Sequence, residues 1–219
     1  MNTKSKKYLL CGFALIILFA LFTVLIKTVD VESVGVNGTE IGFATLNTRC
    51  HNATGVNMTL YNITDWLGLV PVFICMVFGV LGFIQLVKRK NLFKVDFDIL
   101  ILGVYYVIVV LCYLIFEMIP FNYRPILIDG FLECSYPSST TLLVLSVMPT
   151  LVLQVNRRIK NSVVKKLITV ISVLFSVFMV AGRLISGVHW VTDIVGSCIL
   201  SAGLFFVYKG IICQKLQEN

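Results

Sequence analysis

Long apolar runs alternate with short polar or charged segments along the whole chain. Six of these runs are long enough, or nearly so, to cross a hydrocarbon core, which needs about 20 apolar residues. Because a backbone inside a bilayer must satisfy its own hydrogen bonds, each run is expected to form a helix. The pattern predicts an all-α polytopic membrane protein with a six-transmembrane-helix bundle. The helices are expected near residues 8–26, 66–87, 98–119, 138–155, 167–186 and 191–208.

One long polar stretch, residues 27–65, separates the first apolar run from the second. We expect it to form a loop outside the membrane, within a single domain that spans residues 1–219, because four glycines interrupt any regular pattern. These glycines are Gly35, Gly38, Gly42 and Gly55. Four Asn-x-Thr sequons begin at Asn37, Asn52, Asn57 and Asn62. They would permit glycosylation, although Asn and Thr are also common loop residues.

The composition and the placement of charge set the class and the orientation of the protein. With 58% hydrophobic and only 13% charged residues, and a mean hydropathy of +0.94, the chain is not a soluble globule. Fourteen of the 18 Lys and Arg residues lie in the segments on the side of the two termini, and four lie on the other side. The positive-inside rule then places both termini in the cytoplasm, in an integral protein of the plasma membrane. The net charge of +7 therefore reflects topology and predicts no nucleic-acid partner.

The seven cysteines show no metal-ligand spacing, so neither a metal nor another cofactor is expected. Four of them sit inside apolar runs, where a cysteine is most simply a small core residue. Cys50 and Cys134 are the two on the outer side, where a disulfide is chemically allowed but not indicated.

Three ionisable residues crowd the outer border between the last two apolar runs: Arg183, His189 and Asp193. Charges beside a bilayer are costly, so such a group suggests a functional site. If a helix begins at His189, Asp193 lies one turn further on the same face and can orient the imidazole as a nucleophile. Arg183 supplies a planar fork suited to phosphate oxygens. The alternative is a lone interfacial histidine with two charges that anchor helix ends.

Two further segments lie at the same outer level. The third run carries Glu117 near its end, and the chain then breaks at Pro120 and reaches Arg124. The fourth run opens at Ser138, Ser139 and Thr140, where the unpaired N–H groups of a helix start favour an anion. That opening would also be explained as a capped helix end. Its coincidence in depth with the two arginines and His189 indicates a phosphate site.

The order and spacing of these residues resemble the type-2 phosphatidic acid phosphatase superfamily of membrane lipid phosphatases. The last motif of that family, Ser-Arg-x5-His-x3-Asp, is matched at Arg183, His189 and Asp193, with Gly182 in place of Ser. Its first motif, Lys-x6-Arg-Pro, is matched at Arg124 and Pro125, but Glu117 replaces Lys. The middle motif, Pro-Ser-Gly-His, is matched at Pro137 and Ser138, and Ser139 and Thr140 replace Gly and His.

The resemblance implies a metal-independent hydrolase of lipid phosphates or diphosphates, polyprenyl diphosphate among them, that forms a phosphohistidine. The distribution of Lys and Arg predicts that its site faces outward. His189 would be the nucleophile and Asp193 its partner. Arg124 and Arg183 would clamp the phosphate, and Ser138 and Ser139 would complete the anion cradle.

The missing histidine at Thr140 removes the proton donor that serves the leaving group in this family. Glu117 substitutes for it if burial keeps the carboxyl protonated, or instead forms an ion pair with Arg124 or Arg183. His51 is expected to be a spectator. A phosphotransferase, or a non-catalytic relative that binds or transports phosphorylated lipids, is the alternative. The complete set of His189, Asp193 and both arginines favours the enzyme.

Overall fold

The computed structural model describes residues 3–215, and its regular structure is helical. The longer helices are α1 (Thr3–Ile26), α4 (Leu69–Arg89), α5 (Phe97–Met118), α6 (Ser139–Arg158), α7 (Ser162–Ile185) and α8 (Val191–Lys215). The shorter elements are α2 (Ala44–Thr54), α3 (Met58–Leu67), and the 3-10 turns η1 (Val36–Gly38) and η2 (Leu92–Lys94). Six helical segments are long and apolar enough to cross a membrane, with α3 and α4 counted as one. This confirms the predicted all-α membrane fold.

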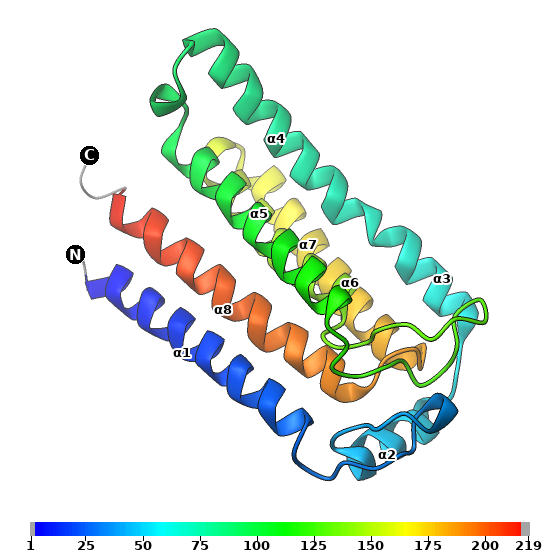
Figure 1. The fold of residues 1–219 in the computed structure, drawn as a ribbon. Coiled ribbons are helices and arrows are strands. Elements are labelled where there is room, and N and C mark those ends of the chain that lie inside the picture. Colours follow the sequence, from blue (N-terminus) through cyan, green and yellow to red (C-terminus); the bar gives the residue numbers. More distant parts are fainter. Residues whose placement is uncertain (1–2, 216–219) are drawn as a thin grey trace.

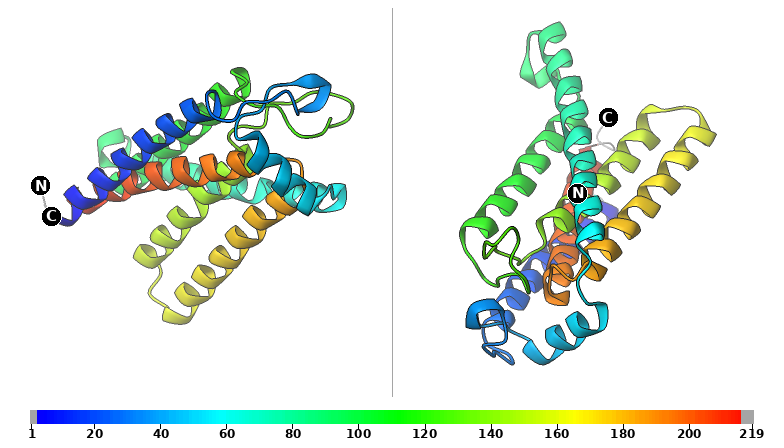
Figure 2. Two further views of the ribbon diagram at one scale, coloured as in Figure 1. Left: turned by 90° about the horizontal axis from the view of Figure 1, so that it is seen from below. Right: turned by 90° about the vertical axis from the view of Figure 1, so that its right-hand side faces the viewer.

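Both ends of the chain lie at one end of the bundle, beside the connection between α4 and α5 (Figure 1). We call this the terminus end. The opposite end carries α2, the loop of residues 119–138 and the turn between α7 and α8, and we call it the site end. The α6–α7 hairpin inclines away from α1 and α8 in the left view of Figure 2.

The first and last helices pack closely through small residues. A Cβ added at Gly12 of α1 would lie 2.7 Å from Cγ2 of Val207 and 2.9 Å from the carbonyl oxygen of Gly203. At the terminus end, the hydroxyl of Ser5 donates to the carbonyl of Gly210 at 2.8 Å. Small residues at such a contact let two backbones approach and gain dispersion energy that lipid does not supply. Figure 1 shows α1 and α8 side by side along their length.

A core between α5, α6 and α8 fixes the rest of the bundle. Tyr105, Tyr106 and Tyr208 are buried there with Leu102 and Val147. The phenol groups are satisfied within the core, since Tyr105 donates to the carbonyl of Ser146 at 3.1 Å and Gln154 donates to Tyr208 at 2.9 Å. At the terminus end of this core, Oδ2 of Asp98 on α5 forms an ion pair with Nη1 of Arg158 on α6 at 2.7 Å.

The structure differs from the sequence prediction in the long polar stretch. Residues 27–65 contain the helix α2 and most of α3, where an irregular loop was predicted. Gly55 ends α2 with a φ of +64°, and the side chain of Asn57 then caps α3 by accepting the N–H of Leu60 at 2.9 Å. The glycine that seemed to interrupt a regular pattern thus separates two helices.

Candidate active site

A sharp turn between α7 and α8 carries His189. Gly187 in this turn has a φ of +68°, a conformation that L side chains rarely adopt. A Cβ on Gly187 would lie 1.8 Å from the carbonyl oxygen of Gly55. The neighbouring Ser186 accepts a hydrogen bond from the N–H of Asn57 at 3.0 Å. The turn is therefore pressed against the connection between α2 and α3.

His189 and Asp193 form a buried pair. Nδ1 of His189 lies 3.5 Å from Oδ2 of Asp193, and both side chains are at most 1% exposed. The helix α8 begins at Val191, the start predicted for this span, so His189 lies in the turn just before the helix. The N–H of Trp190 donates to Oδ2 of Asp193 at 2.8 Å, so the carboxylate also caps the start of this helix. The contact directs Nε2 away from Asp193 and into the site.

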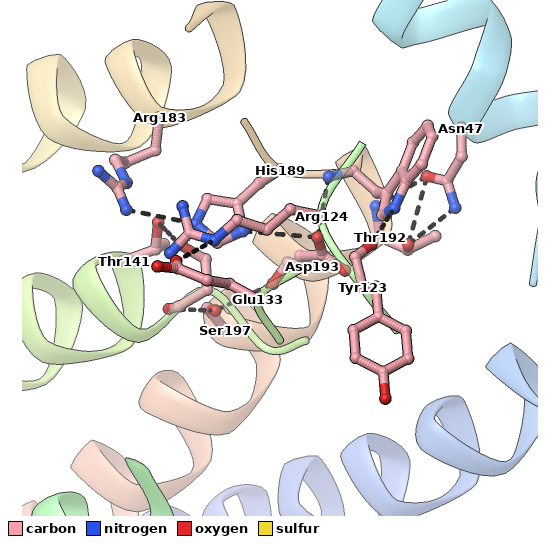
Figure 3. A network of polar contacts seen from close by, with 12 residues as sticks. Asn47, Tyr123, Arg124, Glu133, Thr141, Arg183, His189, Thr192, Asp193 and Ser197 are labelled. Carbon is pink, nitrogen blue, oxygen red and sulfur yellow. Dashed lines mark hydrogen bonds and ion pairs between the residues drawn. The ribbon is translucent and has the colours of Figure 1, made fainter. Parts of the chain in front are cut away.

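The guanidinium of Arg183 contacts Nε2 of His189, the ring nitrogen that does not face Asp193. Its Nη2 lies 3.4 Å from Nε2 of His189, and its Nη1 lies 3.4 Å from Oδ1 of Asp65 on α3. The guanidinium also stacks over the ring of Tyr61, 4.9 Å from the ring centroid. Figure 3 shows the His189 ring between the Arg183 guanidinium and the Asp193 carboxylate. The arginine is fully buried and fixed by three groups.

Arg124 approaches from the loop of residues 119–138. Its Nε lies 3.1 Å from Oε2 of Glu133, and its guanidinium lies 5.7 Å from the centroid of the same Tyr61 ring. The indole of Trp190 donates to the carbonyl of Tyr123 at 2.7 Å, which ties this loop to the segment that carries His189. Two arginines thus contact the same aromatic ring at the site end.

The electrostatics of the site favour an anion. Burial, and then the charges of Arg124 and Arg183, hold the pKa of His189 well below its ordinary value, so the imidazole is neutral. Nη1 of Arg124 and Nε of Arg183 are buried without a hydrogen-bond partner among residues 3–215. Buried donors are costly when unpaired, so an oxyanion between the arginines would satisfy groups that the protein leaves open.

The start of α6 lies beside this pair. The N–H of Ser138 donates to the carbonyl of Asp193 at 3.2 Å, and its hydroxyl donates to Thr141 at 3.0 Å. Ser197 donates to the carbonyls of both Ser138 and Asp193, at 2.8 and 2.9 Å, and so joins α6 to α8. The backbone and the hydroxyl of Ser138 are therefore engaged in hydrogen bonds within the protein, and these bonds hold α6 against α8. The N–H groups of the first turn that follows have no acceptor within the helix.

Glu117 and Thr140 face different spaces. Glu117 lines a cavity of about 10 Å³, the size of one water molecule, together with Ser139 and His189. It forms no ion pair with either arginine in the described part of the chain. Thr140 lines a larger groove of about 450 Å³ between α4, α5 and the start of α6, which it shares with Ser139 and Asp65. Ser139 stands between the two spaces.

Sequence reasoning missed three residues of this site: Tyr61, Asp65 and Glu133. Tyr61 and Asp65 are four residues apart on α3 and therefore share a face, which was the one local signal that could have indicated them. The predicted spectator His51 packs its ring 5.5 Å from that of Trp190 and lies next to the site without entering it. No three His, Cys, Asp or Glu side chains within residues 3–215 lie close enough together to hold a metal ion, and the seven cysteines are unpaired.

Comparison with known proteins agrees with this geometry. The family model of the PAP2 superfamily matches residues 99–214, which include Arg124, Arg183, His189 and Asp193. The chain is an integral membrane protein that belongs to the PAP2 superfamily, as its motifs predicted. No curated protein matches it significantly.

One solved structure has the same fold. It is described as the crystal structure of the first transmembrane PAP2 type phosphatidylglycerolphosphate phosphatase from Bacillus subtilis. The two structures align with a TM-score of 0.66 and 19% sequence identity, over 93% of this chain and 96% of the other. The six-helix arrangement is therefore common to both proteins.

Proposed function

We propose that this protein is a phosphatase of phosphorylated membrane lipids and that it works through a phosphohistidine on His189. The observation that carries the proposal is the buried imidazole, with Asp193 at Nδ1 and Arg183 at Nε2. Membership of the PAP2 superfamily supports the phosphatase activity. A protein that only binds phosphate has no need for an oriented nucleophile of this kind.

The reaction would run in two steps. Nε2 of His189 attacks phosphorus while the bond from phosphorus to the lipid oxygen breaks, and the lipid leaves with that oxygen. Water then attacks the phosphorus, the P–N bond breaks, and inorganic phosphate departs. Asp193 would hold the Nδ1 proton in place and stabilise the charge that forms on the ring. Arg124 and Arg183 would bind the equatorial oxygens, and the first-turn N–H groups of α6 at Ser139 would assist them.

The groove beside the site supports a lipid substrate. It runs between α4 and α5 and is lined largely by apolar side chains, among them Leu69, Val72 and Val110. Its polar end reaches Ser139 and Thr140 at the start of α6. A lipid tail in this groove would bring its phosphorylated end to the arginines. Both lipid monophosphates and diphosphates, including polyprenyl diphosphates, fit this description.

The same proposal includes an outward-facing site, because fourteen basic residues stand at the terminus end and four at the site end. Both termini would then lie in the cytoplasm of a plasma-membrane protein. Catalysis would require no metal, because the two arginines already supply the positive charge that phosphoryl transfer requires.

The decisive experiment measures phosphate released from a panel of lipid monophosphates and diphosphates, with and without chelator, by wild type and by His189→Ala. We expect release by wild type alone, unchanged by chelator, and an acid-labile phosphate on His189 after rapid quenching. The replacement of the family histidine by Thr140 favours one alternative, a lipid-binding relative. Tight lipid binding without phosphate release by wild type would establish that alternative. Transfer of the phosphate to an added alcohol would identify a phosphotransferase.

A further inference from the structure

A carboxylate outside the family motifs contacts the nucleophile's own arginine. Oδ1 of Asp65 lies 3.4 Å from Nη1 of Arg183, and Nη2 of the same guanidinium lies 3.4 Å from Nε2 of His189. Arg183 is fully buried, whereas the side chain of Asp65 is 56% exposed. Asp65 therefore stands at the edge of the site, one guanidinium away from the proposed nucleophile.

Asp65 also lies on the side of the site that faces the groove. It lines the 450 Å³ groove together with Ser139 and Thr140. Gly68, which follows the last residue of α3, brings the end of this helix close to α6, since a Cβ there would be 2.8 Å from the backbone carbonyl oxygen of Asp65 and 3.3 Å from Cγ2 of Thr140. Asp65 thus lines the same groove as Thr140, the position where the family carries its acid–base histidine. Glu117 instead lines the small cavity against His189 and is absent from the groove lining.

The His189 side and the groove side of the site have different roles in an in-line displacement. The attacking and leaving groups occupy opposite ends of the reacting phosphorus, so if His189 is at one end, the lipid oxygen is at the other. A lipid seated in the groove places that end toward Asp65 and Thr140. The water that later cleaves the phosphohistidine enters from the end that the lipid has left. A base for this water must therefore lie on the groove side.

We propose that Asp65 is the general base that activates this water, a proposal that rests on the function proposed above. In the second step, the carboxylate of Asp65 takes one proton from water as the oxygen attacks phosphorus. The P–N bond breaks, its electron pair returns to Nε2 of His189, and inorganic phosphate leaves. The Asp65 proton then passes to solvent, to which this side chain is open. The hydroxyl of Thr140 is too weak a base for this task.

The test uses Asp65→Asn in the full-length protein, with a lipid diphosphate labelled on its terminal phosphate. We expect one equivalent of lipid product in a rapid burst, accumulation of labelled phosphohistidine, and a steady-state rate lowered about 10²- to 10⁴-fold, the usual range for a lost acid–base group. Asp65→Glu, which keeps a carboxylate, should recover turnover without accumulation. Glu133→Gln is the matched control, because Glu133 pairs with the other arginine, and it should raise KM without accumulation of phosphohistidine.

Three results would overturn the proposal. The first is normal turnover by Asp65→Asn. The second is slow turnover without a burst and without phosphohistidine, as expected if Asp65 only positions Arg183 or supports the fold. The third is equal accumulation in Glu133→Gln. The function proposed above is tested separately in the same assay, because it fails only if wild type releases no phosphate or if His189→Ala still does.

Discussion

Nε2 of His189 lies 3.4 Å from Nη2 of Arg183 in a region closed to solvent. Burial first, and then the charges of Arg124 and Arg183, lower the pKa of His189, so the neutral form of the imidazole is favoured. In the proposed mechanism, the lone pair of Nε2 would then attack phosphorus without a base to remove a proton from it. Arg183 would thus contribute both to phosphate binding and to the neutral state of the proposed nucleophile.

The first prediction concerns pH. Because the pKa of His189 is held well below 6.5, by burial first and then by Arg124 and Arg183, kcat/KM should persist as pH falls through 6.5 and decline only at lower pH. Arg183→Gln should move the acid limb of phosphohistidine formation toward higher pH. An acid limb of wild type centred at 6.5 or above would contradict the assignment.

The free energy of unfolding should depend on pH through His189. Below pH 6.5 the unfolded chain protonates His189 and the folded chain does not, so the free energy of unfolding falls as pH falls, by at most about 1.4 kcal/mol per pH unit. Above pH 6.5 both states are neutral and the contribution is constant. Thermal unfolding in detergent at pH 5 and pH 7 would measure this, and His189→Ala should weaken the dependence.

Gly187→Ala should lower kcat by about 10²-fold or more. The left-handed backbone costs an alanine about 1 kcal/mol or more, and its Cβ would lie 1.8 Å from the carbonyl oxygen of Gly55, so the turn that carries His189 must move. Even a shift of about 1 Å lowers the rate of an oriented reaction roughly 10²-fold. The measurement is kcat, together with the unfolding temperature.

The matched control for this substitution is Gly79→Ala. Gly79 lies inside α4 with no atom within 4 Å of the added Cβ, so alanine there should leave activity unchanged and raise stability slightly. Equal effects of the two substitutions would show that the turn geometry at Gly187 is not what positions His189.

Tyr61→Ala should weaken phosphate binding by about 2- to 30-fold. Its ring lies under both guanidinium groups, at 4.9 Å from Arg183 and 5.7 Å from Arg124, and cation–π contacts contribute about 0.5–2 kcal/mol. Inhibition by inorganic phosphate measures the affinity directly. Tyr61→Phe keeps the ring and should retain the wild-type inhibition constant, whereas a comparable loss in both variants would assign the effect to the hydroxyl.

The substrate preference should follow from Thr140. A lipid monophosphate must expel an alkoxide, which needs a proton, whereas a lipid diphosphate expels a phosphate anion that is stable near neutral pH. The preference for diphosphate should reach about 10²- to 10⁴-fold, and Thr140→His should raise monophosphate turnover selectively. Glu117→Gln tests whether Glu117 already supplies the proton. Faster monophosphate turnover by wild type would refute the argument.

The orientation can be tested with two exposed phenylalanines. Phe131 at the site end is 71% exposed and Phe93 at the terminus end is 92% exposed, so a cysteine at either position should be reactive. A membrane-impermeant thiol reagent added to intact cells should label Phe131→Cys and leave Phe93→Cys unlabelled, with the modified position identified by mass spectrometry. The opposite pattern would place the site in the cytoplasm.

The features that could be predicted from the sequence are those that a short stretch of residues determines by itself. The helical spans follow from the requirement that a lipid-embedded backbone pair with itself, and Arg183, His189 and Asp193 lie within one short segment. The pairing of Arg183 with Asp65 joins residues far apart in the chain and has no local signature. Asp65 also lies in a polar stretch that read as a loop, because its helices are stabilised by contacts with the turn at Gly187 more than by their own periodicity.

The close packing of α1 against α8 has a consequence for biosynthesis. Among the described helices, α1 leaves the ribosome first and α8 last. The surface of α1 around Gly12 therefore stays without its contact to α8 while the intervening helices are made. Asp193 stands in the first turn of α8, and the pairing that closes the bundle therefore also brings in this carboxylate. A nascent chain halted before α8 would carry both arginines and His189 but no group to orient the imidazole. In the proposed mechanism, catalytic competence would thus arrive only with the insertion of α8.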